Sequence, residues 1–203
     1  MLSIENLKFF HCGPVNLTLS SGQCVGVSGE SGTGKSLLLR SIADLDEHQG
    51  QCRLDEVSAQ SMPANEWRRQ VALLPADSQW WFDTVGEHFT EMDPVLLGKL
   101  GFPAEVKNWS IRRMSSGEKQ RLALLRVLQN QPRVLLLDEP TANLDKRNSA
   151  IFEQVVAEYL EQHQACAFWV SHDHGQLDRV ADVQFDLKDG RLLEKTSDMT
   201  ALN

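Results

Sequence analysis

The sequence predicts an α/β fold in which helices cover a mainly parallel sheet. Short apolar segments alternate along the chain with segments whose apolar residues recur at helical spacing. Residues 134–137 are all apolar, which is typical of a strand covered on both faces. Glycines are concentrated between residues 29 and 34, directly after an apolar segment and before a helical one. Together these observations favour a core in which a strand leads through a glycine loop into a helix.

The expected elements follow from the same patterns in chain order. Strands are expected over residues 23–28, 71–74, 134–137, 167–170, 183–187 and 191–193, and helices over residues 36–45 and 149–162. Leu45 closes the apolar stripe of the first helix. Pro75 ends the strand before it, because proline cannot donate to a sheet ladder. The step Asp189-Gly190 predicts a hairpin between the last two strands.

The length of 203 residues suits a single domain with a large core. Residues 76–115 differ from the rest in composition and periodicity. They are rich in aromatic residues, are interrupted by Pro94 and Pro103, and are only loosely periodic. We interpret them as a small inserted helical subdomain. The core is then formed by residues 1–75 and 116–203.

The charge and the cysteines exclude several classes of function. A net charge of −8 disfavours a nucleic-acid-binding surface, since phosphate contacts need clustered Lys and Arg. The spacing of Cys12, Cys24, Cys52 and Cys166 matches no metal site, and we expect reduced thiols of a cytosolic chain. No apolar run approaches the roughly 18 residues that span a bilayer, and the N-terminus lacks the pattern of a signal peptide. Any membrane-spanning part is therefore expected on another subunit.

The glycine loop has the pattern G-x-x-x-x-G-K-[ST], which is typical of a phosphate-binding loop. Its eight residues are Gly29, Glu30, Ser31, Gly32, Thr33, Gly34, Lys35 and Ser36. The glycines allow successive backbone N–H groups to surround phosphates, and the start of the following helix adds positive dipole. Lys35 is expected to reach the terminal phosphates, and the hydroxyl of Ser36 is expected to bind Mg²⁺.

Two carboxylates follow the apolar strand of residues 134–137. Asp138 suits a contact to Mg²⁺, direct or through water. Glu139 suits a general base acting on an attacking water. The same pair would be an ordinary acidic end of a strand if the phosphate loop were absent.

Three further blocks surround this strand in the sequence. The first contains Ser115, Ser116, Gly117 and Glu118, where Ser115 and Glu118 have the spacing of a helix capping box. After the strand come the block Asn143-Leu144-Asp145 and the block Trp169-Val170-Ser171-His172-Asp173. His172 thus falls at the end of another expected strand. His163 and His174 lack such a context, and we interpret them as surface residues.

These blocks, in this order, make the chain similar to ATP-binding-cassette (ABC) ATPases over nearly its whole length. The resemblance implies a P-loop NTPase core of the RecA-like type with an N-terminal antiparallel β portion. It implies that ATP is held by the phosphate loop of one subunit and by the signature helix, from Ser115 to Glu118, of an opposing one. It further implies that Asp145 belongs to the D-loop at the subunit interface and that His172 contacts the γ-phosphate. Phe10 or His11 is expected to stack on adenine.

Three positions depart from the family pattern, one of them the expected adenine-stacking aromatic, which falls at His11 with Phe10 beside it. Ala76 stands where the Q-loop glutamine is expected, and its methyl group cannot bind Mg²⁺ or water; Asp77 or Gln79 could substitute. Ser116 replaces a glycine of the signature. The segment Trp80-Trp81-Phe82 follows Ala76 where family members contact a permease, so it is either an interface anchor or filling of the small subdomain.

The resemblance implies an ATP-hydrolysing subunit of a membrane transporter, which forms an ATP-dependent homodimer on the cytoplasmic face of the membrane and binds an integral membrane permease. Within the family, the chain looks similar to iron-export ATP-binding subunits, with lipoprotein or peptide exporters as alternatives. Two other hypotheses are a soluble ABC ATPase without a transport role and an ATP-dependent clamp that hydrolyses weakly because of Ala76. A GTPase is disfavoured, because no N-K-x-D motif is present.

Overall fold

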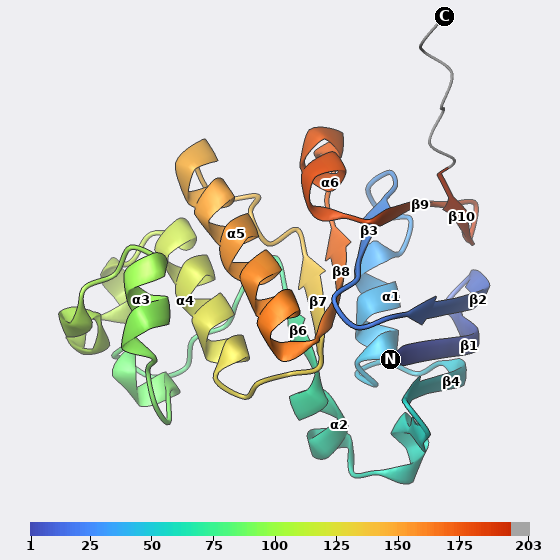
Figure 1. Cartoon of the computed structure of the whole chain (residues 1–203), viewed down its shortest axis with the longest axis horizontal. Helices are drawn as coiled ribbons and strands as arrows, with labels where there is room; N and C mark the ends of the chain where they lie inside the picture. Colours follow the sequence, from blue (N-terminus) through green and yellow to red (C-terminus); the bar gives the residue numbers. More distant parts are fainter. Residues whose placement is uncertain (196–203) are drawn as a thin grey trace, which may run out of the picture.

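The computed structural model describes residues 1–195, which form two sheets with helices around the larger one (Figure 1). The larger sheet has six strands in the order β10-β9-β3-β8-β7-β6. Their bounds are β3 Cys24–Ser28, β6 Val71–Leu74, β7 Val134–Asp138, β8 Cys166–Val170, β9 Val183–Lys188 and β10 Arg191–Glu194. All neighbours pair in parallel except β10, which runs antiparallel to β9. The predicted α/β class and mainly parallel sheet are therefore confirmed, while residues 196–203 of the expected core lie outside the described part.

The smaller sheet is antiparallel, as expected for the N-terminal part of the chain. Its order is β2-β1-β4-β5, with strands Leu2–Phe9 (β1), Cys12–Leu19 (β2), Gln49–Leu54 (β4) and Val57–Ser58 (β5). The short 3-10 turn η1, Ala59–Ser61, follows the last strand.

Two hydrophobic cores lie on the two faces of the large sheet. The first is shared by the small sheet, α1 (Lys35–Ile42), Trp67 of α2 (Ala64–Gln70) and one face of the large sheet. The second contains α4 (Ser116–Leu128), α5 (Lys146–His163), Leu177 of α6 (His174–Val180) and the other face. Neighbouring residues such as Leu135 and Leu136 belong to different cores, because successive side chains of a strand point to opposite faces. The helices α1 and α4 consequently lie on opposite sides of the sheet (Figure 1).

Two helix ends differ from the sequence expectation. Helix α1 ends at Ile42 and not at residue 45, because Asp44 takes a positive φ of 55°, which stops a helix. Leu45 therefore leaves the apolar stripe and is 40% exposed. Helix α5 begins at Lys146, three residues earlier than expected, because the carboxylate of Asp145 accepts a hydrogen bond from the backbone N–H of Asn148 at 2.8 Å.

Residues 75–115 carry little regular helix. The single α-helix there is α3, Pro94–Lys99, and three 3-10 turns accompany it: η2 (Gly86–His88), η3 (Ala104–Asn108) and η4 (Ile111–Arg113). Leu97 of α3, Val106 of η3 and Ile111 of η4 join the second core. We call residues 75–89 the aromatic segment, since it contains Trp80, Trp81 and other aromatic residues.

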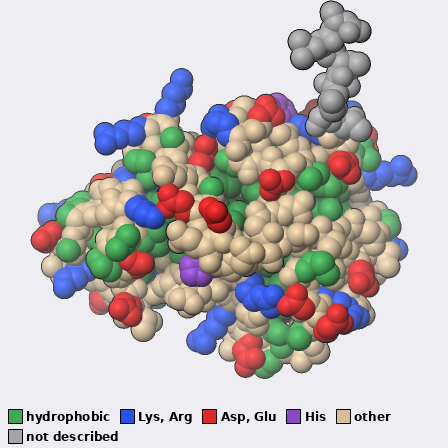
Figure 2. Space-filling model, viewed as in Figure 1, with side chains coloured by type: hydrophobic (Ala, Val, Ile, Leu, Met, Phe, Trp, Pro, Cys, Tyr) green, Lys and Arg blue, Asp and Glu red, His purple; other side chains and the backbone are tan. Residues whose placement is uncertain are grey.

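Charged side chains lie on the surface, and the cysteines lie inside the protein. On the face seen in Figure 2, acidic and basic side chains are interspersed. Within residues 1–195, no helix combines the length and the apolar character needed to cross a bilayer. The four cysteines are buried free thiols, and burial raises the pKa of Cys24 and of Cys52 to about 12.

Candidate functional site

Three neighbouring strands of the large sheet end at one edge, and each is followed by predicted site residues. Strands β3, β8 and β7 are adjacent and parallel, so their carboxyl ends lie together. The phosphate loop follows β3, His172 follows β8, and Asp138 ends β7. The backbone continues the alignment beyond the strands, since the N–H of Glu139 donates to the carbonyl of Val170 at 3.0 Å. The fold therefore brings these residues to a common edge, which we call the carboxyl edge.

The phosphate loop has a backbone that only glycine adopts without strain. Gly29 has a φ of 143°, and a Cβ at this position would lie 2.6 Å from the carbonyl oxygen of Leu187. Gly34 has a φ of 105° and caps the start of α1. The loop thus leads β3 directly into the positive end of α1, the arrangement that binds phosphate groups.

The ammonium group of Lys35 lies across the loop. Its Nζ donates to the carbonyl oxygens of Gly29 and Glu30, both at 2.8 Å, and the residue is only 6% exposed. Burial lowers the pKa of Lys35, while the carboxylates of Glu139, Asp138 and Asp186 oppose that shift. The cation is therefore held at the loop by groups that phosphate oxygens could replace.

Glu139 and His172 face each other at the carboxyl edge. Nε2 of His172 lies 2.8 Å from Oε1 of Glu139, and both side chains are partly exposed. Glu139 has a positive φ of 45°, so its side chain leaves the direction that β7 would give it. Because a carboxylate only accepts, this contact requires the hydrogen of the imidazole on Nε2. The pair can thus orient a water molecule and remove a proton from it.

The residues present fit a magnesium ion. The hydroxyl of Ser36 is on an exposed residue at the start of α1, and Asp138 is half-buried at the end of β7. Mg²⁺ usually takes one or two protein ligands and completes its shell with waters and substrate phosphates. The described residues 1–195 contain no cluster of three or more His, Cys, Asp or Glu suited to a metal.

The predicted signature residues form the start of α4. Ser115 caps the helix by accepting from the N–H of Glu118 at 3.2 Å, and the Glu118 carboxylate accepts from the N–H of Ser115 at 2.8 Å. The backbone N–H and the hydroxyl of Ser115, which both donate to this carboxylate, lower the pKa of Glu118. A Cβ on Gly117 would lie 2.9 Å from the carbonyl of Asn143, so the signature and the D-loop are in contact. Ser116 is exposed beside them.

The expected adenine-stacking residues occupy the turn between β1 and β2. Phe10 is 76% exposed, and its ring centroid lies 3.9 Å from that of His11, whereas Phe9 is buried in the first core. The N–H of Gly13 donates to the carbonyl of Gly190 at 2.8 Å, which ties this turn to the β9–β10 hairpin. Two exposed rings are thus fixed at the edge of the small sheet.

Asp77 and Gln79, the two side chains that could substitute for the missing glutamine at Ala76, contact each other. Gln79 donates to Asp77 at 3.4 Å, and within the described chain neither side chain forms a hydrogen bond to Ser36 or Asp138. The structure reveals instead a contact that the sequence did not indicate. The buried amide of Gln120 in α4 donates to the carbonyl of Pro75 at 3.0 Å and accepts from the hydroxyl of Ser78 at 3.1 Å.

The three aromatic residues after Ala76 differ in their exposure. Trp80 packs against the second core, whereas Trp81 is 64% and Phe82 is 48% exposed. The guanidinium of Arg126 lies over the rings of Trp80 and Trp81, at 4.4 and 4.9 Å from their centroids. Burial lowers the pKa of Arg126.

A second buried glutamine, Gln176, was also not predicted from the sequence. The amide of Gln176 in α6 donates to the hydroxyl of Thr141 at 2.7 Å and to Glu153 at 2.8 Å, and it accepts from the indole of Trp169 at 3.2 Å. It thereby connects the segment after β7 with β8, α5 and α6. In the sequence, Gln176 stands out only as a polar residue directly before an apolar one, Leu177, which the structure buries.

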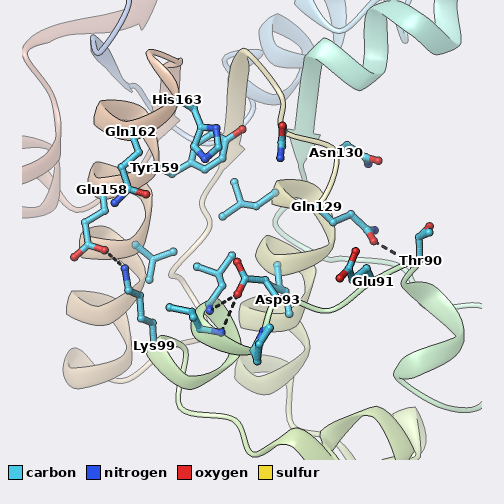
Figure 3. A pocket seen from close by; sticks show the side chains of 17 residues that line it. Thr90, Glu91, Asp93, Lys99, Gln129, Asn130, Glu158, Tyr159, Gln162 and His163 are labelled. Atoms are coloured by element: carbon cyan, nitrogen blue, oxygen red, sulfur yellow. Dashed lines mark hydrogen bonds and ion pairs between the residues drawn. The ribbon is translucent and has the colours of Figure 1, made fainter.

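A cavity of about 650 Å³ lies away from the carboxyl edge, between α3, α4 and α5 (Figure 3). Its rim includes the ion pair of Lys99 with Glu158 at 2.5 Å and the stacked rings of Tyr159 and His163 (Figure 3). None of the predicted site residues lines it. Cavities of about 570 and 720 Å³ lie instead on either side of His172, one against the phosphate loop and one against Glu139.

The strand, the glycine loop with its lysine and the adjacent acidic strand define a P-loop nucleotide-binding protein. The family model described as ABC transporter matches residues 12–142. The chain belongs to the ABC transporter family.

Similar proteins support this membership. The chain is 34% identical to the aliphatic sulfonates import ATP-binding protein SsuB of Pseudomonas entomophila, over 87% of this chain and 67% of that protein. It is 29% identical to the probable iron export ATP-binding protein FetA of Escherichia coli, over 83% of this chain and 81% of that protein, in line with the resemblance to iron-export subunits. Among solved structures, the dimeric ATP-binding cassette MJ0796 bound to ADP and Pi superposes with a TM-score of 0.82 at 22% identity, covering 97% of this chain and 98% of that one.

Proposed function

We propose that this protein is the ATP-binding and ATP-hydrolysing subunit of an ABC membrane transporter. The observation that carries the proposal is the convergence of Lys35, Asp138, Glu139 and His172 on one edge of the sheet, with Nε2 of His172 at 2.8 Å from the Glu139 carboxylate. The relatives named above are ATP-binding proteins of an import and of an export system. We treat residues 1–203 as one ABC ATPase domain, with residues 76–115 as its inserted part.

Each residue at the edge has a defined task in this proposal. The backbone N–H groups of the phosphate loop and the ammonium of Lys35 bind the phosphates of ATP, and the carbonyls of Gly29 and Glu30 release that ammonium. Glu139 accepts the proton of the attacking water, and His172 orients Glu139 before it turns toward the γ-phosphate. Mg²⁺, held by Ser36 and Asp138, supplies neutralisation of phosphate charge when bound.

The site is completed by a second copy of the chain. The signature start of α4 and the phosphate loop before α1 belong to helices on opposite faces of the large sheet. Ser115, Ser116 and Gly117 therefore serve an ATP bound by the partner, with Asp145 at the interface and Phe10 and His11 against adenine. The dimeric form of MJ0796, with ADP and Pi, supports such an arrangement. Hydrolysis then separates the two copies and moves the transporter.

The permease partner docks on the aromatic segment. Exposed Trp81 and Phe82 adjoin a groove of about 430 Å³ that also includes Leu45 and Arg126. Among residues 1–195, the buried Nη1 of Arg126 has no hydrogen-bond partner. A cytoplasmic segment of the permease would cover the aromatic rings and supply an acceptor to this guanidinium. The protein would accordingly lie at the cytoplasmic face of the cell membrane through its partner.

Steady-state hydrolysis by the purified chain tests the proposal. Glu139→Gln keeps the shape of the side chain and removes the base, so turnover should fall by roughly 10²- to 10⁴-fold while ATP binding persists. Glu161→Gln, an exposed change on α5, is the matched control and should leave turnover unchanged. Equal turnover in the wild type and Glu139→Gln would exclude Glu139 as the base. Magnesium-free buffer should abolish turnover in the wild type.

Steady-state hydrolysis and copurification from native membranes together separate the other hypotheses. An ATP-dependent clamp would bind ATP and show no turnover above that of Glu139→Gln. A soluble ABC ATPase without a transport role would hydrolyse ATP normally and fail to copurify with an integral membrane protein from its native membranes. The proposed transporter subunit hydrolyses ATP and copurifies with a permease.

A further inference from the structure

The imidazole of His88 is buried beneath the aromatic segment, with 7% of the residue exposed. Its Nδ1 lies 3.0 Å from the carbonyl oxygen of Thr84. Its Nε2 accepts hydrogen bonds from the backbone N–H groups of Trp81 and Phe82, both at 3.0 Å. A carbonyl only accepts and a backbone N–H only donates, so the hydrogen of the ring must be on Nδ1. The geometry therefore requires a neutral imidazole in one tautomer.

Three aromatic rings surround this imidazole edge-on. Their centroids lie 4.8 Å (Trp80), 4.9 Å (Trp81) and 5.1 Å (Phe82) from the centroid of His88. Trp80 is partly buried against the second core, whereas Trp81 and Phe82 remain largely exposed. Burial of a large apolar side chain lowers the free energy. An exposed ring therefore tends to turn toward the protein unless its backbone is held. The two hydrogen bonds to Nε2 hold the backbone at both exposed residues.

The charged groups around His88 come from its own turn and from three packed elements. On the turn, Glu87 accepts from the neighbouring threonine hydroxyl at 2.6 Å, and Asp83 lies 3.9 Å from an arginine of η4. From outside, Arg126 of α4 and Arg68 of α2 line the groove that His88 also lines, and Lys107 of η3 packs against η2. The charged groups that share the groove with the imidazole are cationic, and the carboxylate of Glu87 already accepts from the backbone N–H and the hydroxyl of Thr84.

We propose that neutral His88 is the positioning residue that presents Trp81 and Phe82 as an exposed docking surface, and that protonation of His88 releases this surface. An added proton on Nε2 would face two N–H donors and place a second cation beside Arg126, so both backbone bonds would break. Histidine is the side chain that changes charge between about pH 5 and 8. The presentation of the surface is then lost as the pH falls. The identity of its partner as a permease depends on the proposed function; the switch itself does not.

Fluorescence of Trp81 tests the switch on the isolated chain. The signal is the emission of the wild type minus that of Trp81→Phe, followed from pH 8 to pH 5. We expect a single titration in the wild type. His88→Gln should remove the titration and keep the spectrum seen at pH 8, because the amide can accept the two backbone N–H groups, donate to the carbonyl of Thr84 and does not titrate in this range. His163→Gln, at an exposed histidine, is the matched control and should leave the titration intact.

Nitrogen NMR of the wild type gives a second measurement that needs no variant. At pH 8 the side chain of His88 should show a hydrogen on Nδ1 and none on Nε2. A hydrogen on Nε2, or an undiminished Trp81 titration in His88→Gln, would overturn the proposal. Failure of the ATPase or copurification tests would leave both of these results unaffected, so the two proposals fail separately.

Discussion

The carboxyl edge and the aromatic segment both carry side chains proposed for function, but they are held in different ways. At the carboxyl edge, Asp138, Glu139 and His172 lie within two residues of a strand end, and the parallel ladder fixes them. In the aromatic segment, side chains from a distant helix hold the backbone: Gln120 binds Pro75 at 3.0 Å, and Arg126 covers two indole rings.

This difference separates two parts of the proposed function. In the proposed function, the groups of one copy that bind phosphate and activate water lie at strand ends or in the phosphate loop. The aromatic segment departs from the family at Ala76, and its link to the signature helix α4 runs through Gln120 and Ser78. Helix α4 thus contacts the aromatic segment through Gln120 and through Arg126, which lies over the ring of Trp81.

The largest expected effect comes from removing the cation of the carboxyl edge. ATP at a hundredfold excess over its Kd should stabilise the wild type by roughly 2.7 kcal/mol, and Lys35→Ala should lose most of this gain. Thermal unfolding with and without ATP measures it. Lys107→Ala, an exposed change on η3, should keep the full stabilisation. A full ATP shift in Lys35→Ala would show that the loop binds phosphate without its lysine.

A smaller effect is expected where the aromatic segment is tied to α4. Gln120→Leu removes the amide and leaves the carbonyl of Pro75 and the buried hydroxyl of Ser78 without their partner, which should cost about 1–3 kcal/mol of unfolding free energy. Denaturant unfolding measures the loss, with the exposed Gln162→Leu as control. Hydrogen exchange should also quicken in residues 75–82. An unchanged midpoint and unchanged exchange would mean that the segment is held by other contacts.

The smallest effect concerns the missing Q-loop glutamine. Ala76→Gln should raise steady-state turnover by up to about tenfold, equivalent to about 1.4 kcal/mol of activation free energy, because an amide could hold the attacking water or Mg²⁺. Ala157→Gln, on the exposed face of α5, should leave turnover unchanged. If Ala76→Gln hydrolyses ATP at the wild-type rate, groups already present fill this role.

The carboxyl edge could be predicted from the sequence because its signals are local. A glycine pattern, an apolar strand and a polar residue at its end each lie within a few positions, and parallel strands bring their ends together. The capping box of Ser115 and Glu118 is local in the same sense, and the structure contains both of its bonds. These features depend little on the rest of the fold.

The remaining features depend on contacts between distant residues. The backbone at Trp81 and Phe82 is held by His88, six or seven positions away, and Trp80 is partly buried against the second core. No period or motif marks such contacts. The early end of α1 was not predicted for another reason. Asp44 has a positive φ, and aspartate adopts such a φ only in some places, so the residue type alone does not mark the end of the helix.

The central claim is that a second copy of the chain completes the ATP site. Light scattering of Glu139→Gln tests it most directly, because this variant should bind ATP without consuming it. With ATP and Mg²⁺ the mass should rise from the 22.8 kDa of one chain to twice that value, and with ADP it should return to one chain. A variant that binds ATP and stays at the mass of one chain over all accessible protein concentrations would contradict the account.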